Sequence, residues 1–138
     1  MTKYVIAMLL VGAMVSISEA KSKTQGSIRK PASLPVGNVQ VGGNEEEDAC
    51  GSSGIALAST TLVQRSKSGD VQFNTVPVNA MVYMCDYSGS EDSAWIGVVY
   101  GKKNQDCGVS SPIKDRQDYK GPCKSGWIKK SFIELVAG

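Results

Sequence analysis

The sequence predicts an all-β domain, a small antiparallel barrel whose closing strands lie in the C-terminal half. Three stretches support this: Val-Tyr-Met-Cys at residues 82–85, Trp-Ile-Gly-Val-Val-Tyr at 95–100 and Gly-Trp-Ile at 126–128. β-Branched and aromatic residues dominate them, and such residues fit the pleated, half-buried surface of a sheet. A chain of 138 residues has room for one domain and an N-terminal segment.

The first strands are expected between residues 53 and 76. Residues 53–65 mix small and β-branched residues without a helical stripe, which favours one strand or two short strands with a bend. Ser-Lys-Ser-Gly-Asp at 66–70 predicts a turn. A further strand at 71–76 ends before Pro77, because proline has no N–H to donate to a ladder.

A β-hairpin is expected between residues 81 and 101. Its strands, 81–87 and 95–101, flank a polar turn at 88–93. Apolar residues at alternate positions of the two strands should share one face of the sheet. The residues expected on that face are Val82, Met84, Ile96 and Val98.

The strand pattern stops between residues 102 and 124, where two cysteines and several Gly and Pro residues occur. An irregular segment of this length in a small domain is usually functional or held in place. The strand pattern resumes at 125–129. After a short turn at 130–131, a last strand at 132–136 closes the chain.

Residues 1–20 are predicted to be a secretory signal peptide. Lys3 supplies the charged start, residues 5–17 form an apolar run too short to span a bilayer comfortably, and Ser-Glu-Ala at 18–20 is a cleavage site. The alternative is an uncleaved anchor helix. We expect cleavage near Ala20 and a secreted or periplasmic protein without a transmembrane anchor, in an oxidising space.

Residues 21–44 are predicted to be a flexible tail or linker, because they are rich in Lys, Ser, Gly and Pro and show no period. They hold four basic residues and no acidic one. Residues 45–138, the predicted domain, hold 10 Lys and Arg against 12 Asp and Glu. Such a balance disfavours nucleic acid as a partner, since nucleic-acid binders carry a basic face.

Neither a metal nor another cofactor is expected. The chain has no histidine, the commonest metal ligand and general acid or base. The acidic run at 45–48 has no calcium-loop spacing, and a solvated run is the simpler interpretation.

Four cysteines allow three disulfide pairings. Cys107 and Cys123 each lie near the end of an expected strand, and these strands should be neighbours. Their bond would close a loop of roughly 17 residues and contribute about 3 kcal/mol through loop-closure entropy. Cys50 and Cys85 would then join the first strand to the central hairpin. We favour these two bonds over the other pairings.

Catalysis is not expected. A reactive thiol would need a lowered pKa and a reducing compartment, and no Cys-x-x-Cys spacing indicates zinc or redox chemistry. Ser110 and Ser111 have Lys114 nearby as a conceivable base, but no strand–turn–helix elbow surrounds them.

Residues 126–132, Gly-Trp-Ile-Lys-Lys-Ser-Phe, resemble the closing motif of SH3-type domains, Gly-aromatic-aliphatic-Pro-x-Asn-Tyr. Residues 95–100 look like the Trp-bearing strand of the bacterial version. Asp-Cys-Gly-Val-Ser-Ser-Pro at 106–112 and Tyr-Lys-Gly-Pro-Cys-Lys-Ser-Gly-Trp at 119–127 are similar to short secreted bacterial SH3-like proteins, often labelled integron-associated or hypothetical. The resemblance covers residues 78–138 and is weaker over 49–77.

The resemblance implies an SH3-like antiparallel barrel of five or six strands, with the loop between Cys107 and Cys123 as an insertion, and it implies binding rather than catalysis. The motif departs at the positions where a ligand would bind: Lys129 replaces the groove proline and Phe132 replaces the groove tyrosine. The lost hydroxyl and the added ammonium disfavour a proline-rich ligand. The Val-Arg-x-x-Pro segment of bacterial SH3 domains is not evident near residues 63–67.

The candidate ligand-binding surface combines the tryptophan strands with the irregular loop. Its candidate residues are Trp95, Arg116, Tyr119, Trp127, Lys129 and Phe132. The alternative is that the tryptophans pack in the core and the loop covers a barrel edge.

Two functions follow. The first is a binding module for a peptide, such as a cell-wall stem peptide, or for a protein of the cell envelope. The second is a structural protein that self-associates as a homo-oligomer, or an inhibitor of another secreted protein, with no small ligand.

Overall fold

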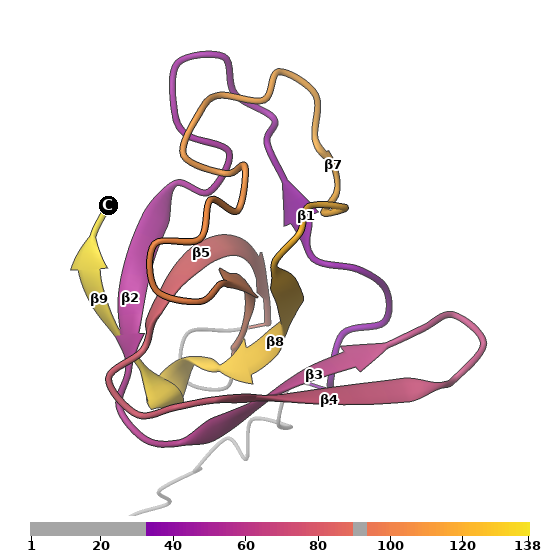
Figure 1. Cartoon of the computed structure of the whole chain (residues 1–138). Helices are drawn as coiled ribbons and strands as arrows, with labels where there is room; N and C mark the ends of the chain where they lie inside the picture. The colour runs from indigo at the N-terminus through magenta and orange to yellow at the C-terminus, as the bar shows by residue number, and fades with distance from the viewer. Residues whose placement is uncertain (1–32, 90–93) are drawn as a thin grey trace, which may run out of the picture.

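The computed structural model describes residues 33–89 and 94–138 (Figure 1). The predicted signal peptide, most of the predicted tail and residues 90–93 of the hairpin turn lie outside the described residues. The elements in chain order are β1 (Gln40–Val41), β2 (Ser52–Ala56), β3 (Thr60–Arg65), β4 (Val71–Val76), β5 (Met81–Ser88), β6 (Trp95–Tyr100), β7 (Gln117–Asp118), β8 (Lys124–Lys129), the 3-10 helix η1 (Lys130–Phe132) and β9 (Ile133–Ala137). In this part of the chain no helix has the length and apolar character needed to cross a membrane.

The predicted all-β class is confirmed, and the strands are antiparallel. Seven of them form one sheet in the order β4-β3-β8-β6-β5-β2-β9, and β1 pairs with β7 in a small second sheet. The hairpin of β3 and β4 extends away from the rest of the sheet in Figure 1. The 53–65 stretch divides into β2 and β3, the second of the two forms expected for it.

The sheet has seven strands, whereas five or six were predicted, and it does not close into a barrel. Within residues 33–89 and 94–138, β4 and β9 each pair on one side only, so that the sheet has two open edges. The bend after Ala56 explains the extra strand. It separates β2, which lies between β5 and β9, from β3, which lies between β4 and β8.

Apolar side chains pack on both faces of the central strands. On the inner face, Val82, Ile96 and Val98 form a cluster with residues of β2, β3, β4, β8 and β9, and Met84 packs against it, as the hairpin pattern predicted. On the outer face, Val99 belongs to a second cluster, which includes Val41, Ala49, Val109 and two of the cysteines. β6 is therefore buried on both sides, and this explains its nearly unbroken apolar sequence.

The two predicted disulfides are confirmed, and both lie on the outer face. Cys50–Cys85 ties the segment before β2 to β5 across 35 positions of sequence, and Cys107–Cys123 closes the irregular loop across 16. The strands that flank this loop are neighbours, since Tyr100 of β6 pairs with Lys124 of β8. The loop covers the outer face instead of extending into solvent.

The expected domain boundary at residue 45 lies too late in the chain. Val39 and Val41 are buried, and Gln40 and Val41 of β1 pair with β7 in the irregular loop. The sequence does not reveal this strand, because β1 has only two residues and lies among glycine and asparagine residues. A strand this short shows no alternation of apolar and polar residues. Residues 39–44 are thus part of the folded domain and not of a tail.

Candidate functional site

Trp127 does not belong to an open binding surface. Its side chain is 4% exposed, and its indole N–H donates to the carbonyl oxygen of Gly37 at 3.4 Å. It lies on the outer face, opposite Gly97 in the β6–β8 pairing. Trp127 and Val39 both approach Gly97 where a larger residue would have its Cβ. The N-terminal segment covers Trp127, which agrees with the alternative that the tryptophans pack in the core.

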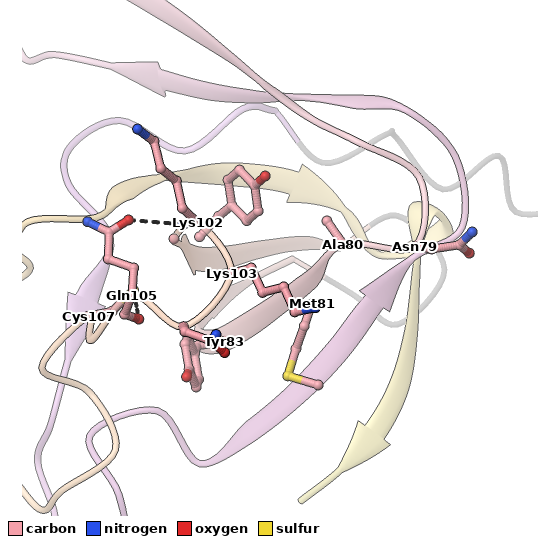
Figure 2. Close-up of a pocket in the computed structure, with 11 residues that line it drawn as sticks. Asn79, Ala80, Met81, Tyr83, Lys102, Lys103, Gln105 and Cys107 are labelled. Carbon is pink, nitrogen blue, oxygen red and sulfur yellow. Dashed lines mark hydrogen bonds between the residues drawn. The ribbon is translucent and has the colours of Figure 1, made fainter.

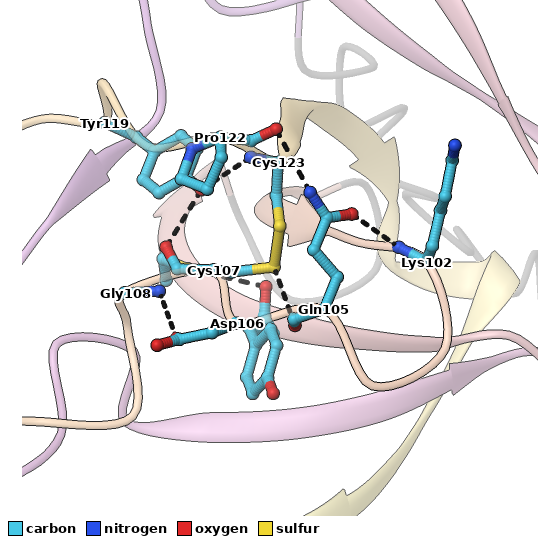
Figure 3. The surroundings of a disulfide bond; sticks show 10 residues. Lys102, Gln105, Asp106, Cys107, Gly108, Tyr119, Pro122 and Cys123 are labelled. Carbon is cyan, nitrogen blue, oxygen red and sulfur yellow. Dashed lines mark hydrogen bonds between the residues drawn. A yellow bond between two sulfur atoms is a disulfide. The ribbon is translucent and has the colours of Figure 1, made fainter.

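Tyr119 serves the fold of the loop. Its hydroxyl donates to the carbonyl oxygen of Cys107 at 2.9 Å and accepts the N–H of Cys123 at 3.1 Å (Figure 3). It therefore bridges the two halves of the disulfide. Burial raises the pKa of Tyr119 above 10.0 and outweighs the hydrogen bond from Cys123, which lowers it; the negative charge of Asp106 raises it further.

Arg116 is also engaged within the protein. Its guanidinium forms an ion pair with Asp86 of β5. The other carboxylate oxygen of Asp86 accepts the backbone N–H of Gln40 at 3.1 Å. This carboxylate thus joins β5, the N-terminal segment and the loop, and a ligand would have to compete with it for Arg116.

The β1–β7 pair is fixed by a carboxylate as well. The amide side chains of Asn38 and Gln40 both donate to Asp118. These two hydrogen bonds lower the pKa of Asp118 below 3.8, and the bond from Asn38 has the larger effect.

Trp95 and Lys129 form a separate, partly exposed pair. They face each other across β6 and β8, and the Lys129 ammonium lies 5.8 Å from the centre of the Trp95 ring. Phe132 is 40% exposed in η1. Among the predicted residues, Trp127, Arg116 and Tyr119 are thus engaged in contacts within the fold. The Trp95–Lys129 pair and Phe132 lie where β6 begins and β8 ends.

A cavity of about 550 Å³ lies at the opposite end of the β5–β6 hairpin from Trp95. One wall comes from the chain entering β5, and the other from the turn that leaves β6 (Figure 2). Met81, Tyr83 and Tyr100 give it an apolar and aromatic surface. Among the residues that the structure describes, Lys102 and Lys103 are its only charged lining residues.

Hydrogen bonds hold the wall that follows β6. The side chain of Gln105 accepts the N–H of Lys102 at 2.9 Å and donates to the carbonyl oxygen of Pro122 at 3.4 Å (Figure 3). Its backbone N–H donates to the Lys102 carbonyl oxygen at 2.9 Å. Cys107 also lines the cavity, so the disulfide to Cys123 anchors this wall.

The wall that precedes β5 is held by β2. Asn79 donates its N–H to the Ala56 carbonyl oxygen at 2.8 Å, and Ala56 donates its N–H to Ala80 at 3.0 Å. Asn79 and Asn104, one on each wall, have φ of 62°, and they are the non-glycine residues with positive φ in the described part of the chain. Non-glycine residues in this conformation concentrate at turns and functional sites.

Sequence reasoning missed this cavity. The available signal was Gly-Lys-Lys-Asn at 101–104, two cations and a residue tolerant of positive φ directly after the tryptophan strand. The approach of residues 79–83 to this turn depends on the β5–β6 register, in which Tyr83 lies opposite Val99.

Comparisons of the chain with protein-family models, with curated proteins and with solved structures find no match. Over residues 33–89 and 94–138, no group of three or more Cys, Asp or Glu residues is arranged to hold a metal ion.

Proposed function

We propose that this protein is a non-catalytic binding module that works outside the cytoplasm and recognises a peptide segment of a protein partner. The observation that carries the proposal is the cavity beside Tyr83 and Tyr100, whose walls are held by backbone hydrogen bonds and a disulfide. A site ordered before binding loses less conformational entropy when the ligand enters. Aromatic surface supplies contact area with few rotatable bonds.

Two features support the compartment and the fold family in this proposal. All four cysteines are paired, and disulfides persist in oxidising spaces. The motif at residues 126–132 supports a relationship with SH3-like domains. The antiparallel sheet is compatible with that relationship, although the sheet is not a closed barrel.

The arrangement of polar side chains supports binding over catalysis. Ser110 and Ser111 would need a neighbouring base, and the Lys114 ammonium instead forms a 2.8 Å ion pair with Glu45. All thiols are oxidised, so no thiolate is available as a nucleophile.

The test is a peptide selection with the oxidised protein after export to the periplasm of an expression host. Random peptides displayed on phage are selected on the protein and then measured individually on a Met81→Ser variant. Met81 lines the cavity and is 57% exposed, so the variant should fold normally. We expect selected peptides to lose affinity on Met81→Ser and to shift the backbone amide signals of residues 79–83 and 101–105. A selection that yields no binder to any part of the protein would refute the proposal.

A second function, self-association, is favoured by the open edge at β9. Among the described strands β9 pairs only with β2, and Leu135 and Val136 are 62% and 53% exposed. Open edge strands without lysine or proline can pair with another chain. We predict that Leu135→Lys converts any dimer seen by light scattering to a monomer, with less than about 0.5 kcal/mol lost in stability. A monomeric parent protein at high concentration would exclude this function.

A further inference from the structure

We propose that the cavity between β5 and the turn after β6 binds an acidic peptide segment, one in which carboxylates flank an apolar side chain. This inference rests on the proposed function and names its ligand class. It starts from the charge of the lining, which in the described part of the chain holds Lys102 and Lys103 and neither Asp nor Glu.

Lys102 and Lys103 differ from three other cations of the domain, each of which has a partner within the described residues. Lys114 pairs with Glu45, Arg116 pairs with Asp86, and Lys129 lies over Trp95. Lys102 and Lys103 are exposed and form no ion pair within residues 33–89 and 94–138. Their ammonium groups are thus available to a ligand.

The acid nearest in sequence does not neutralise them. Asp106 is absent from the lining, and its carboxylate accepts the N–H of Gly108 at 2.8 Å inside the loop (Figure 3). The domain from residue 45 onward holds 12 acidic residues against 10 basic ones. The positive charge at the cavity is therefore local and does not belong to a broad basic face.

The placement of the lysines favours a peptide over a single phosphate group. In Figure 2 the Lys103 side chain extends toward Met81, whereas the Lys102 side chain points in the other direction. Two diverging ammonium groups suit two separated carboxylates better than one compact anion. Met81, Tyr83 and Tyr100 also line the cavity and supply an apolar surface for the side chain between those carboxylates.

The charge distribution of the domain disfavours a polyanionic ligand, such as a membrane or an acidic polysaccharide. A membrane or an acidic polysaccharide attracts proteins through many exposed cations acting together. Here the net charge of residues 45–138 is negative, 10 basic against 12 acidic residues. An acidic peptide uses both properties of the site, the local charge and the apolar surface.

The experiment uses three pools of synthetic peptides, each with a central leucine or tyrosine flanked at varied spacing by Glu, by Gln or by Lys. Binding to the exported, oxidised protein is measured by fluorescence anisotropy and mapped by backbone amide shifts. We expect the Glu pool to bind most tightly. Lys102→Gln with Lys103→Gln should raise its Kd about tenfold, which corresponds to about 1.4 kcal/mol from two partly solvated ion pairs. Raising the salt from about 0.05 to about 0.5 M should weaken the same binding.

The matched control is Lys120→Gln with Lys130→Gln, which changes the net charge equally at two exposed lysines that do not line this cavity. It should bind the Glu pool as the parent protein does. An equal loss in this control would replace a specific site with a general charge effect and overturn the inference.

The remaining outcomes separate this inference from the proposed function. Equal binding of the Gln and Glu pools at residues 79–83 and 101–105 would overturn the acidic ligand and leave the binding module standing. Binding of anionic phosphatidylglycerol vesicles or polygalacturonate, without binding of the Glu pool, would overturn the peptide class. Phage-selected peptides that bind elsewhere would overturn the site, and the absence of any selected peptide would overturn the proposed function as well.

Discussion

Several side chains that resemble ligand-binding groups in sequence serve the fold instead. Trp127 is covered by the N-terminal segment, Tyr119 bridges the two halves of a disulfide, and Arg116 neutralises Asp86. Each supplies a hydrogen bond or charge that the outer layer of the domain needs, because buried polar groups without partners are costly.

Tyr119→Phe should lower the free energy of unfolding by about 1–3 kcal/mol, because the Cys123 N–H and the Cys107 carbonyl oxygen both lose their hydroxyl partner. Urea unfolding at neutral pH measures the loss. A variant as stable as the parent protein would show that solvent replaces the hydroxyl at no cost.

The same substitution should alter the alkaline pH dependence of stability. The pKa of Tyr119 is raised on folding, so the folded state holds the phenol proton more tightly. Its stabilising contribution is complete below about pH 10, the pKa of an unfolded tyrosine, and is lost as the pH rises through the folded value. The decline of the urea midpoint between about pH 9 and pH 11 should therefore be shallower in Tyr119→Phe. Parallel declines would contradict the pKa shift.

At the scale of elements, the irregular segments depend on the disulfides more than the strands do. The strands pair along their length, as β3 and β4 do over six registered positions from Thr60↔Val76 to Arg65↔Val71. The loop between β6 and β8 contains only the two-residue strand β7. Its order comes from Cys107–Cys123, the hydrogen bonds of Tyr119 and the outer apolar cluster.

Replacing Cys107 and Cys123 together by alanine should cost about 3 kcal/mol, and replacing Cys50 and Cys85 about 4 kcal/mol, because the second pair closes the longer loop. Urea unfolding measures both. Limited proteolysis should cut residues 102–122 faster only in the first variant. Equal protection of that loop in both variants would show that packing alone orders it.

At the scale of the whole molecule, the domain has two apolar layers that share the central strands. The inner layer is enclosed by the bent sheet, and the outer layer is covered by segments far apart in sequence, residues 39–50 and 101–123. The cavity lies where the outer loop meets the start of β5. Its shape therefore depends on the correct seating of the outer layer.

A chain that begins at residue 45 should be less stable than one that begins at residue 33, each exported with the same leader. Val39 and Val41 are buried, and their removal loses about 3 kcal/mol of hydrophobic stabilisation and uncovers Trp127. The urea midpoint measures the difference, and tryptophan fluorescence should shift to longer wavelength. Identical unfolding curves would show that the folded domain begins at residue 45 and that residues 39–44 do not stabilise it.

The sequence by itself determined the class of the fold and the positions of the longer strands, and it favoured the disulfide pairing that the structure shows. These features depend on local residue type: the β-branched and aromatic residues of β5 and β6, the turn at 66–70 and the two cysteines that bracket the irregular loop. Only the tertiary structure decided that the sheet stays open, that Trp127 is covered and that a cavity forms between residues 79–83 and 101–105. Those outcomes depend on strand order and on contacts across 40 to 90 positions, such as Trp127 with Gly37, which no local pattern records.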